Sequence, residues 1–159
     1  MAGAQQLALA QGALDHLHQR AYQQRADIAL IAYAGNRAQT LVAPTAARPF
    51  NARQLQTAHW LPQLWAGGAT PFAAAVAAAD ALLAQVARRK PQQQRWLWLL
   101  SDGRSDEQPA RPAHADIVQI VDCERGQRIA LDRCRVLADQ WRADYRTLGE
   151  LIAGDSTPL

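Results

Sequence analysis

The sequence has little cysteine, a single lysine and no long apolar run, and each shortage excludes a class of protein. Two cysteines, Cys123 and Cys134, are too few for a disulfide framework or a metal knuckle, which favours a reducing cytoplasm. No apolar run approaches the ~20 residues that a membrane helix needs. Residues 1–11 lack the basic and apolar regions of a secretion signal. We therefore expect a cytoplasmic protein without a membrane partner. Cys134 lies on the apolar face of a predicted helix, so we expect an inert buried thiol there.

The positive charge of the chain carries no nucleic-acid signature. The formal net charge is +3, and the basic residues are scattered apart from Arg88, Arg89 and Lys90. That triplet stands where a predicted helix ends, and the helix dipole favours cations there. No aromatic residues alternate with basic ones to form a platform for stacking bases. Nucleic acid is therefore not an expected partner.

Helical and strand patterns alternate along the 159 residues, a length that suits one domain. Apolar residues that recur every three or four positions predict helices at 4–24, 52–64, 71–88 and 129–141. Apolar runs predict strands at 27–34, 95–100 and 116–122, and weaker strands at 39–43 and 144–148. The strand at 39–43 follows a tight turn and should be antiparallel at the edge of the sheet. The pattern predicts an α/β fold, with a mostly parallel sheet and helices on both of its faces.

The predicted domain covers residues 1–152, and residues 153–159 are expected to form a flexible tail. A helix opens the chain, whereas doubly wound folds usually open with a strand that lies centrally in the sheet. Nothing before Ala4 can supply such a strand. We therefore expect that the first, central strand is missing and that the chain is a truncated form of a longer protein.

Two segments fall where open α/β sheets bind ligands, beyond the carboxyl ends of the strands. Residues 67–71, Gly-Gly-Ala-Thr-Pro, lead into a helix, and residues 101–103, Ser-Asp-Gly, directly follow a strand. Thr70 and Asp102 thus offer a hydroxyl and a carboxylate, which are oxygen ligands of the kind that Mg²⁺ takes. Each segment also has an ordinary structural explanation, because Thr-Pro starts helices and Asp-Gly makes turns.

These segments resemble von Willebrand factor A (VWA) domains. More narrowly, they are similar to the domain at the C-terminal end of the magnesium chelatase D subunit and its relatives beside cobalt chelatase. The likeness is carried by Gly-Gly-Ala-Thr-Pro at 67–71, Ser-Asp-Gly-Arg at 101–104 and Leu-Ala-Gln-Gly-Ala at 9–13. Stretches at 21–33, 121–126 and 143–148 extend it over nearly the whole chain. The fold that the resemblance implies is a Rossmann-like VWA domain.

The resemblance also implies a metal-ion-dependent adhesion site. In such domains a divalent cation is held by an Asp-x-Ser-x-Ser motif, a threonine and an aspartate, and a partner's carboxylate completes its coordination shell. By this resemblance Thr70 and Asp102 are the second and third parts, whereas no Asp-x-Ser-x-Ser occurs in the chain. Mg²⁺ demands a near-octahedral shell of oxygens, so the incomplete site implies only weak Mg²⁺ binding.

The function implied is that of a non-catalytic protein–protein interaction module. It would dock onto an AAA+ ATPase chelatase subunit, or onto another chelatase component, during metal insertion into a tetrapyrrole. Two alternatives stay open from the residues alone. One is a small α/β enzyme that uses Asp102 as acid or base, although no His, Cys or Ser partner stands at a second strand end. The other is a nucleotide-binding module built on Gly67 and Gly68, although neither Gly-x-Gly-x-x-Gly nor Gly-x-x-x-x-Gly-Lys is present.

Overall fold

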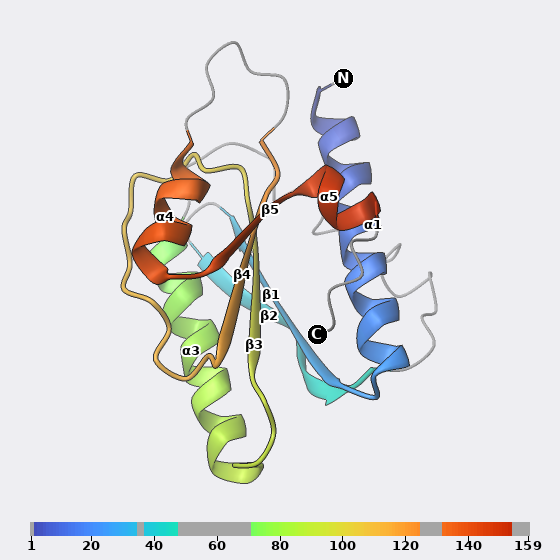
Figure 1. The fold of residues 1–159 in the computed structure, drawn as a ribbon, viewed down its shortest axis with the longest axis vertical. Coiled ribbons are helices and arrows are strands. Elements are labelled where there is room, and N and C mark those ends of the chain that lie inside the picture. The colour runs from blue at the N-terminus through green and yellow to red at the C-terminus, as the bar shows by residue number, and fades with distance from the viewer. Residues whose placement is uncertain (1, 35–36, 48–70, 125–131, 154–159) are drawn as a thin grey trace. The chain divides into compact units, whose positions relative to one another are not determined.

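The computed structural model describes residues 2–34, 37–47, 71–124 and 132–153 (Figure 1). The chain divides into two compact units, Met1–Pro71 and Phe72–Leu159, and each is described by itself. Several predicted features lie outside the described residues: the helix at 52–64, the glycines at 67 and 68, Thr70, and the tail beyond 153. The single domain predicted over 1–152 stays a prediction.

The first unit contains a helix and a β-hairpin. α1 (Ala2–Gln23) is followed by β1 (Asp27–Ala34), which α1 contacts. β1 pairs with β2 (Arg37–Ala46) in an antiparallel arrangement, since two residues are too few for a crossover. The predicted antiparallel strand at 39–43 is thereby confirmed, and it is longer than the sequence indicated.

The second unit contains a three-stranded parallel sheet in the order β3-β4-β5. Its strands are β3 (Trp96–Ser101), β4 (Ile117–Asp122) and β5 (Asp144–Thr147). All three were predicted, but β5 ends one residue early because Leu148 already begins a helix. β4 lies in the middle, and its residues from 118 to 122 are all buried.

The strand pairing differs from the single parallel sheet that the sequence predicted. Residues 27–34 were expected to share a sheet with 95–100 and 116–122. Among the described strands, β1 pairs only with β2, whereas β3 pairs with β4. β2 pairs with the backbone hydrogen-bonding groups along one edge of β1. The described residues include no strand that pairs with the other edge of β1. Apolar patterns identify strands, but they do not specify which strands are neighbours.

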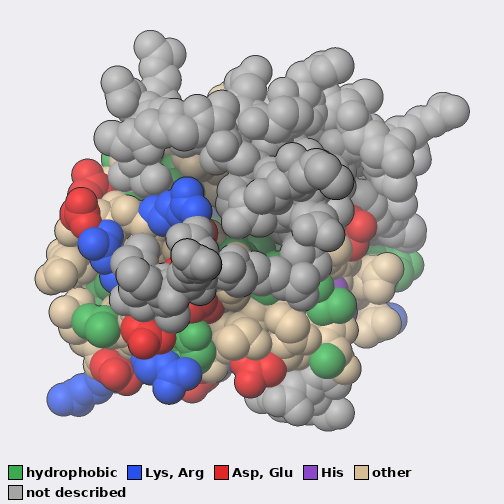
Figure 2. Space-filling model, turned by 90° about the horizontal axis from the view of Figure 1, so that it is seen from above, with side chains coloured by type: hydrophobic (Ala, Val, Ile, Leu, Met, Phe, Trp, Pro, Cys, Tyr) green, Lys and Arg blue, Asp and Glu red, His purple; other side chains and the backbone are tan. Residues whose placement is uncertain are grey.

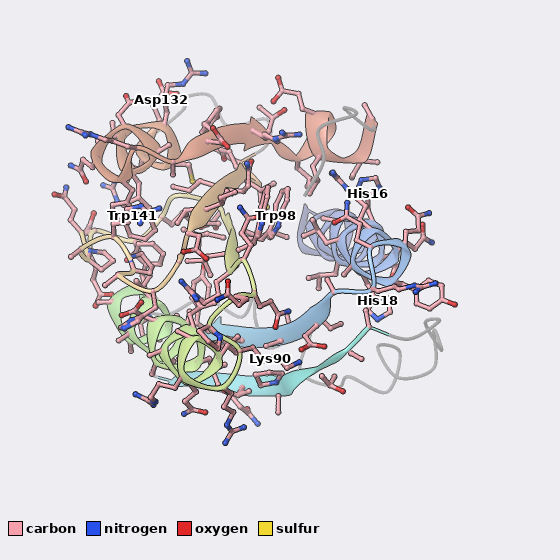
Figure 3. The ribbon with its side chains drawn as sticks, turned by 60° about the horizontal axis from the view of Figure 1, so that its bottom comes forward. His16, His18, Lys90, Trp98, Asp132 and Trp141 are labelled. Carbon is pink, nitrogen blue, oxygen red and sulfur yellow. The ribbon has the colours of Figure 1, made fainter. Side chains whose placement is uncertain are left out.

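Helices cover both faces of the second sheet (Figure 1). α3 (Phe72–Arg89) and α4 (Arg133–Trp141) lie on one side, and α5 (Leu148–Ala153) lies on the other. Phe72 of α3 stacks on Trp141 of α4, with ring centroids 6.3 Å apart. Trp98 lies on the opposite face of the sheet from Trp141 (Figure 3) and stacks with Trp96. The architecture is mixed α/β and compatible with a Rossmann-like fold.

Local chemistry explains the length of α3. Its eighteen residues are rich in alanine, the residue with the best intrinsic helix propensity. Arg88 and Arg89 stand in its last turn, where the helix dipole favours cations, as the sequence predicted. None of the helices in the described parts of the chain is long and apolar enough to cross a membrane.

Candidate functional site

Asp102 follows β3 in a tight turn at the carboxyl end of the parallel sheet. Gly103 has a φ of 68°, a left-handed conformation that glycine adopts without strain. Its backbone N–H donates to the Ser101 hydroxyl at 3.2 Å. One Asp102 carboxylate oxygen accepts a hydrogen bond from the Arg104 backbone at 3.2 Å, and the other lies 3.4 Å from Arg104 Nε. The Asp102 side chain is 26% exposed, so a partner can reach it at the edge where the sequence predicted a site.

The described residues do not make a Mg²⁺ site by themselves. Asp102 supplies one carboxylate, and the neighbouring Arg104 guanidinium competes with a metal ion for its oxygens. Within the described ranges, no group of three or more His, Cys, Asp or Glu side chains is placed to hold a metal ion. Thr70, the other predicted ligand, lies outside those ranges. The predicted pairing of Thr70 with Asp102 therefore stays a prediction.

The start of α3 lies beside the segment that follows Asp102. The Ala73 backbone N–H, in the first turn of α3, donates to Glu107 Oε2 at 2.6 Å. Helix N-termini leave such N–H groups unpaired, and they favour a negative charge. Ala73 is three positions after Thr70 in the sequence. The sequence did not indicate Glu107 as a site residue, because its partner is 34 positions away.

Residues 102–115, here called the strap, connect β3 to the parallel β4 without a helix. Arg133, in the first turn of α4, pairs with Asp106 at 2.5 Å. The same guanidinium nitrogen lies 3.4 Å from the Arg104 carbonyl and 3.2 Å from the Ser105 carbonyl, and donates to both. One arginine thus ties three consecutive positions of the strap to α4.

Two further contacts anchor the rest of the strap. The Trp141 indole N–H donates to the Pro109 carbonyl at 3.0 Å, and the His114 backbone N–H donates to Asp80 of α3 at 2.8 Å. Pro112 is also buried. The strap is therefore held by side chains of α3 and α4, in addition to the local turns at its start.

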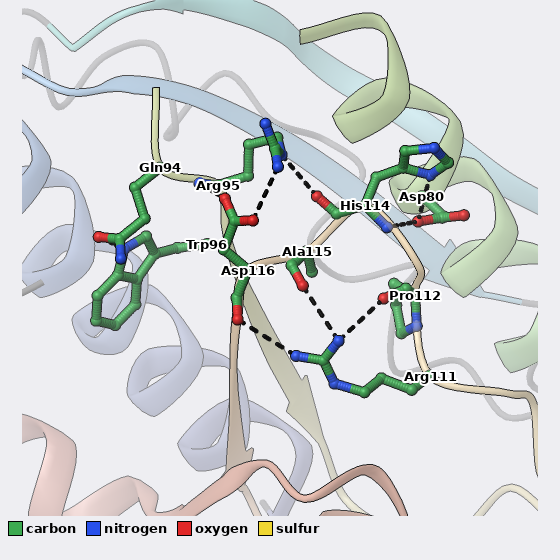
Figure 4. Close-up of polar contacts among 9 residues, drawn as sticks. All are labelled: Asp80, Gln94, Arg95, Trp96, Arg111, Pro112, His114, Ala115 and Asp116. Carbon is green, nitrogen blue, oxygen red and sulfur yellow. Dashed lines mark hydrogen bonds and ion pairs between the residues drawn. The ribbon is translucent and has the colours of Figure 1, made fainter. Parts of the chain in front are cut away.

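A network of ion pairs and hydrogen bonds lies at the other end of the sheet, where β3 and β4 begin (Figure 4). Arg95 pairs with Asp116 at 2.8 Å, and the second Asp116 oxygen accepts the Arg95 backbone N–H at 2.7 Å. His114 Nδ1 lies 3.2 Å from Asp80, and Arg111 donates to backbone carbonyls at 112, 115 and 116. Ligands of open α/β sheets bind at the opposite, carboxyl end, so we assign this network a structural role.

Two buried thiols lie beneath the carboxyl end of the sheet. The backbone N–H of Cys123 donates to the Ser101 carbonyl at 2.8 Å, and Cys134 Sγ lies 3.6 Å from the same oxygen. Burial, helped by the negative charge of Asp122, raises the pKa of each thiol to about 12. Thiols with such a pKa stay protonated at neutral pH, whereas nucleophilic attack needs the thiolate. This agrees with the inert thiol predicted at Cys134.

A second carboxylate stands at a strand end, although it was not among the predicted site residues. Asp122 ends β4, is 8% exposed, and accepts hydrogen bonds from the Tyr145 hydroxyl and the Glu124 backbone, both at 2.8 Å. Burial and the bond to Asp122 raise the pKa of Tyr145 to about 12. The Arg135 guanidinium lies 4.9 Å above the Tyr145 ring. Asp122 ends an apolar run in the sequence, just as Asp102 follows one, and this position could have indicated it as a site residue. In the structure its carboxylate instead binds the Tyr145 hydroxyl, which gives it a structural role.

A small hollow opens between the strap, the start of α3 and α4. Its volume is about 170 Å³. Phe72, Cys134 and Leu137 line it with apolar atoms and are themselves buried. Val136, 50% exposed, lies at its edge. The hollow is next to the end of β3, the region where doubly wound folds bind ligands.

Comparison with known proteins found no match among family models, curated proteins or solved structures. The VWA resemblance therefore stays a prediction from sequence motifs. The α/β architecture rests on the strands and helices described above.

Proposed function

We propose that this chain is a non-catalytic protein–protein interaction module of the VWA type, similar to that of magnesium and cobalt chelatase D-type subunits. The observation that carries the proposal is the position of Asp102. It stands at the carboxyl end of a parallel strand, with a partly exposed carboxylate and the first turn of α3 close to the same segment. The VWA resemblance implies a partner-binding surface at this end of the domain.

The sheet of the second unit supports the proposal. Its strands are parallel and have the order β3-β4-β5, and parallel sheets with helices on their faces are typical of doubly wound folds.

The chemistry of the site favours binding over catalysis. An acid–base enzyme needs a group that is free to exchange a proton with its substrate. Asp102 is engaged by Arg104, Asp122 is buried under Tyr145, and Cys134 is a protonated thiol. The nucleotide alternative depends on Gly67 and Gly68, which lie outside the described residues.

In this proposal the chain docks onto an AAA+ ATPase chelatase subunit, or onto another chelatase component, and assists metal insertion into a tetrapyrrole. Mg²⁺ held by Thr70 and Asp102 would contribute little by itself. Most of its octahedral shell would have to come from water or from the partner.

The test is calorimetric titration of the chain with the AAA+ ATPase subunits of magnesium chelatase and of cobalt chelatase, in ATP with and without Mg²⁺. We expect one of them to bind, and Asp102→Asn to weaken that binding roughly fivefold to tenfold, as loss of an interface charge does. Asp15→Asn, a change at an exposed carboxylate of α1, is the matched control and should bind like the parent. Binding of neither subunit, or stoichiometric ATP binding by the chain alone, would contradict the proposal.

A further inference from the structure

We infer that the hollow between the strap and α4 is a docking pocket for one aliphatic side chain of a partner protein, and that its acidic rim selects a lysine or arginine next to that side chain. The inference rests on the proposed function, that the chain binds a partner protein. It adds the chemistry that the partner must present: an aliphatic residue followed by a cationic one.

The hollow has the size of one side chain. Its volume of about 170 Å³ is comparable with the cavity of roughly 150 Å³ that accepts benzene in another protein. Phe72, Cys134 and Leu137 give it an apolar floor, and none of the three is more than 9% exposed. Val136 is half exposed at its edge, one of the few large apolar side chains that the described surface leaves open to water. An aliphatic group in the hollow would cover Val136 and rest on that floor.

The walls of the hollow are already in place. Glu107 ties the strap to the start of α3, and Arg133 ties the strap to α4 through Asp106. The stacked rings of Phe72 and Trp141 join the two helices. A pocket built in advance avoids the loss of conformational freedom that otherwise weakens binding.

The rim of the hollow favours a cation. Two carboxylates, Asp106 and Glu107, and one guanidinium, Arg133, line it. Asp106 is 87% exposed and uses Oδ1 for Arg133, while Glu107 uses Oε2 for the backbone of α3. Within the described parts of the chain, the other oxygen of each carboxylate has no hydrogen-bond partner. A partner's cation would meet both oxygens without breaking an existing contact.

Charges of both signs lie on the described part of the surface that is seen from above (Figure 2). Acidic and basic side chains are interspersed there with small hydrophobic areas. Such a surface does not attract one sign of charge over a long range, so selection of a cation must come from the local pair of carboxylates.

A peptide titration tests the pocket directly. The full chain, labelled at its methyl groups, is titrated in an NMR experiment with three capped tetrapeptides: Gly-Leu-Lys-Gly, Gly-Ala-Lys-Gly and Gly-Leu-Glu-Gly. We expect the Leu-Lys peptide to shift the Val136 and Leu137 methyl signals saturably. The Ala-Lys and Leu-Glu peptides should bind at least roughly fivefold more weakly, through lost apolar burial and lost charge pairing respectively. Equal binding of all three, or shifts confined to other residues, would overturn the inference.

Substitutions test the same pocket in the complex with the ATPase subunit. Val136→Glu and Asp106→Lys should each weaken binding at least roughly fivefold, since one places a charge in the apolar edge and the other repels the cation. Ile152→Glu, at an exposed aliphatic position of α5, and Asp15→Lys are the matched controls and should bind like the parent. Thermal unfolding of each variant separates lost binding from lost folding.

The two proposals fail in different ways. If the ATPase subunit binds the parent, Val136→Glu and Asp106→Lys equally well, the pocket is wrong and the proposed function stands. If the Leu-Lys peptide occupies the hollow while neither ATPase subunit binds, the proposed function is wrong and the pocket stands. If neither the peptide nor an ATPase subunit binds, both are wrong.

Discussion

At the scale of single residues, the Tyr145 hydroxyl donates to the buried carboxylate of Asp122 at the carboxyl end of the sheet. Removing the Tyr145 hydroxyl leaves a buried carboxylate oxygen without its donor. We expect Tyr145→Phe to lower the free energy of unfolding by about 1–3 kcal/mol, measured by urea denaturation. Tyr22→Phe makes the same change at an exposed position of α1 and should change stability by less than ~0.5 kcal/mol. Equal effects of the two substitutions would show that the buried bond does not stabilise the fold.

Asp80 makes the stability of the second unit sensitive to acid. Burial tends to raise the pKa of Asp80, but hydrogen bonds from the His114 backbone and imidazole outweigh it, so the pKa lies below its ordinary value of 3.8. A lowered pKa in the folded state stabilises the fold above the unfolded-state pKa, and that contribution is lost as the pH falls through the lower folded-state pKa.

We therefore expect Asp80→Asn to be less stable than the parent at pH 7 by up to about 1 kcal/mol, since the pair is near the surface. The difference should shrink as the pH falls below about 4, where the unfolded-state carboxyl becomes protonated. Urea denaturation of both proteins between pH 7 and pH 3 measures it, with Asp15→Asn as the control. If the difference in stability between the parent and Asp80→Asn were the same at every pH, the charge of Asp80 would not contribute to the stability of the fold.

At the scale of elements, the strap is ordered by contacts with its neighbours. Trp141→Phe keeps a ring that can stack on Phe72 but removes the indole donor to the Pro109 carbonyl. We expect a loss of about 1 kcal/mol of stability and faster hydrogen exchange at residues 105–111. Trp98→Phe, on the opposite face of the sheet, should lower stability without faster exchange in the strap. Unchanged exchange in Trp141→Phe would mean that other contacts suffice to order the strap.

The elements themselves could be predicted from the sequence, whereas their contacts could not. Apolar runs located β3 and β4, and alanine-rich periodicity located α3 to within a residue at each end. Asp102 was predictable because it directly follows such a run. The contact of Glu107 with α3 and the bond between Asp122 and Tyr145 were not predictable, because the partners lie 34 and 23 positions apart and no local pattern encodes such a distance.

At the scale of the whole molecule, the proposed metal dependence is weak. Only Thr70 and Asp102 match the VWA cation motif, and Arg104 competes for the Asp102 oxygens. We expect a millimolar dissociation constant for Mg²⁺, so that 1 mM Mg²⁺ stabilises the chain by on the order of 0.4 kcal/mol or less. Thermal unfolding with Mg²⁺ and with EDTA measures this effect. Micromolar affinity that disappears in Asp102→Asn would show that a complete site exists.

The sequence indicates the strands but does not determine that they form one continuous sheet. Each strand was assigned from its own residues, but a strand's neighbours depend on which edges are already paired. The tight turn between β1 and β2 favours pairing within the hairpin, and β3, β4 and β5 pair among themselves. Only the first of these pairings has a local signal in the sequence.

The helix-free connection between β3 and β4 has a consequence for the order of folding. About fifteen residues separate the two strands, so closing this loop costs little chain entropy and their pairing can form early. The strap that makes the loop is anchored by Asp80, which precedes both strands, and by Arg133 and Trp141, which follow them. Its anchors can therefore engage only after α3 and α4 have docked. We expect the hollow beside α4 to be the last feature of this unit to assemble and the first to be lost when the unit opens locally.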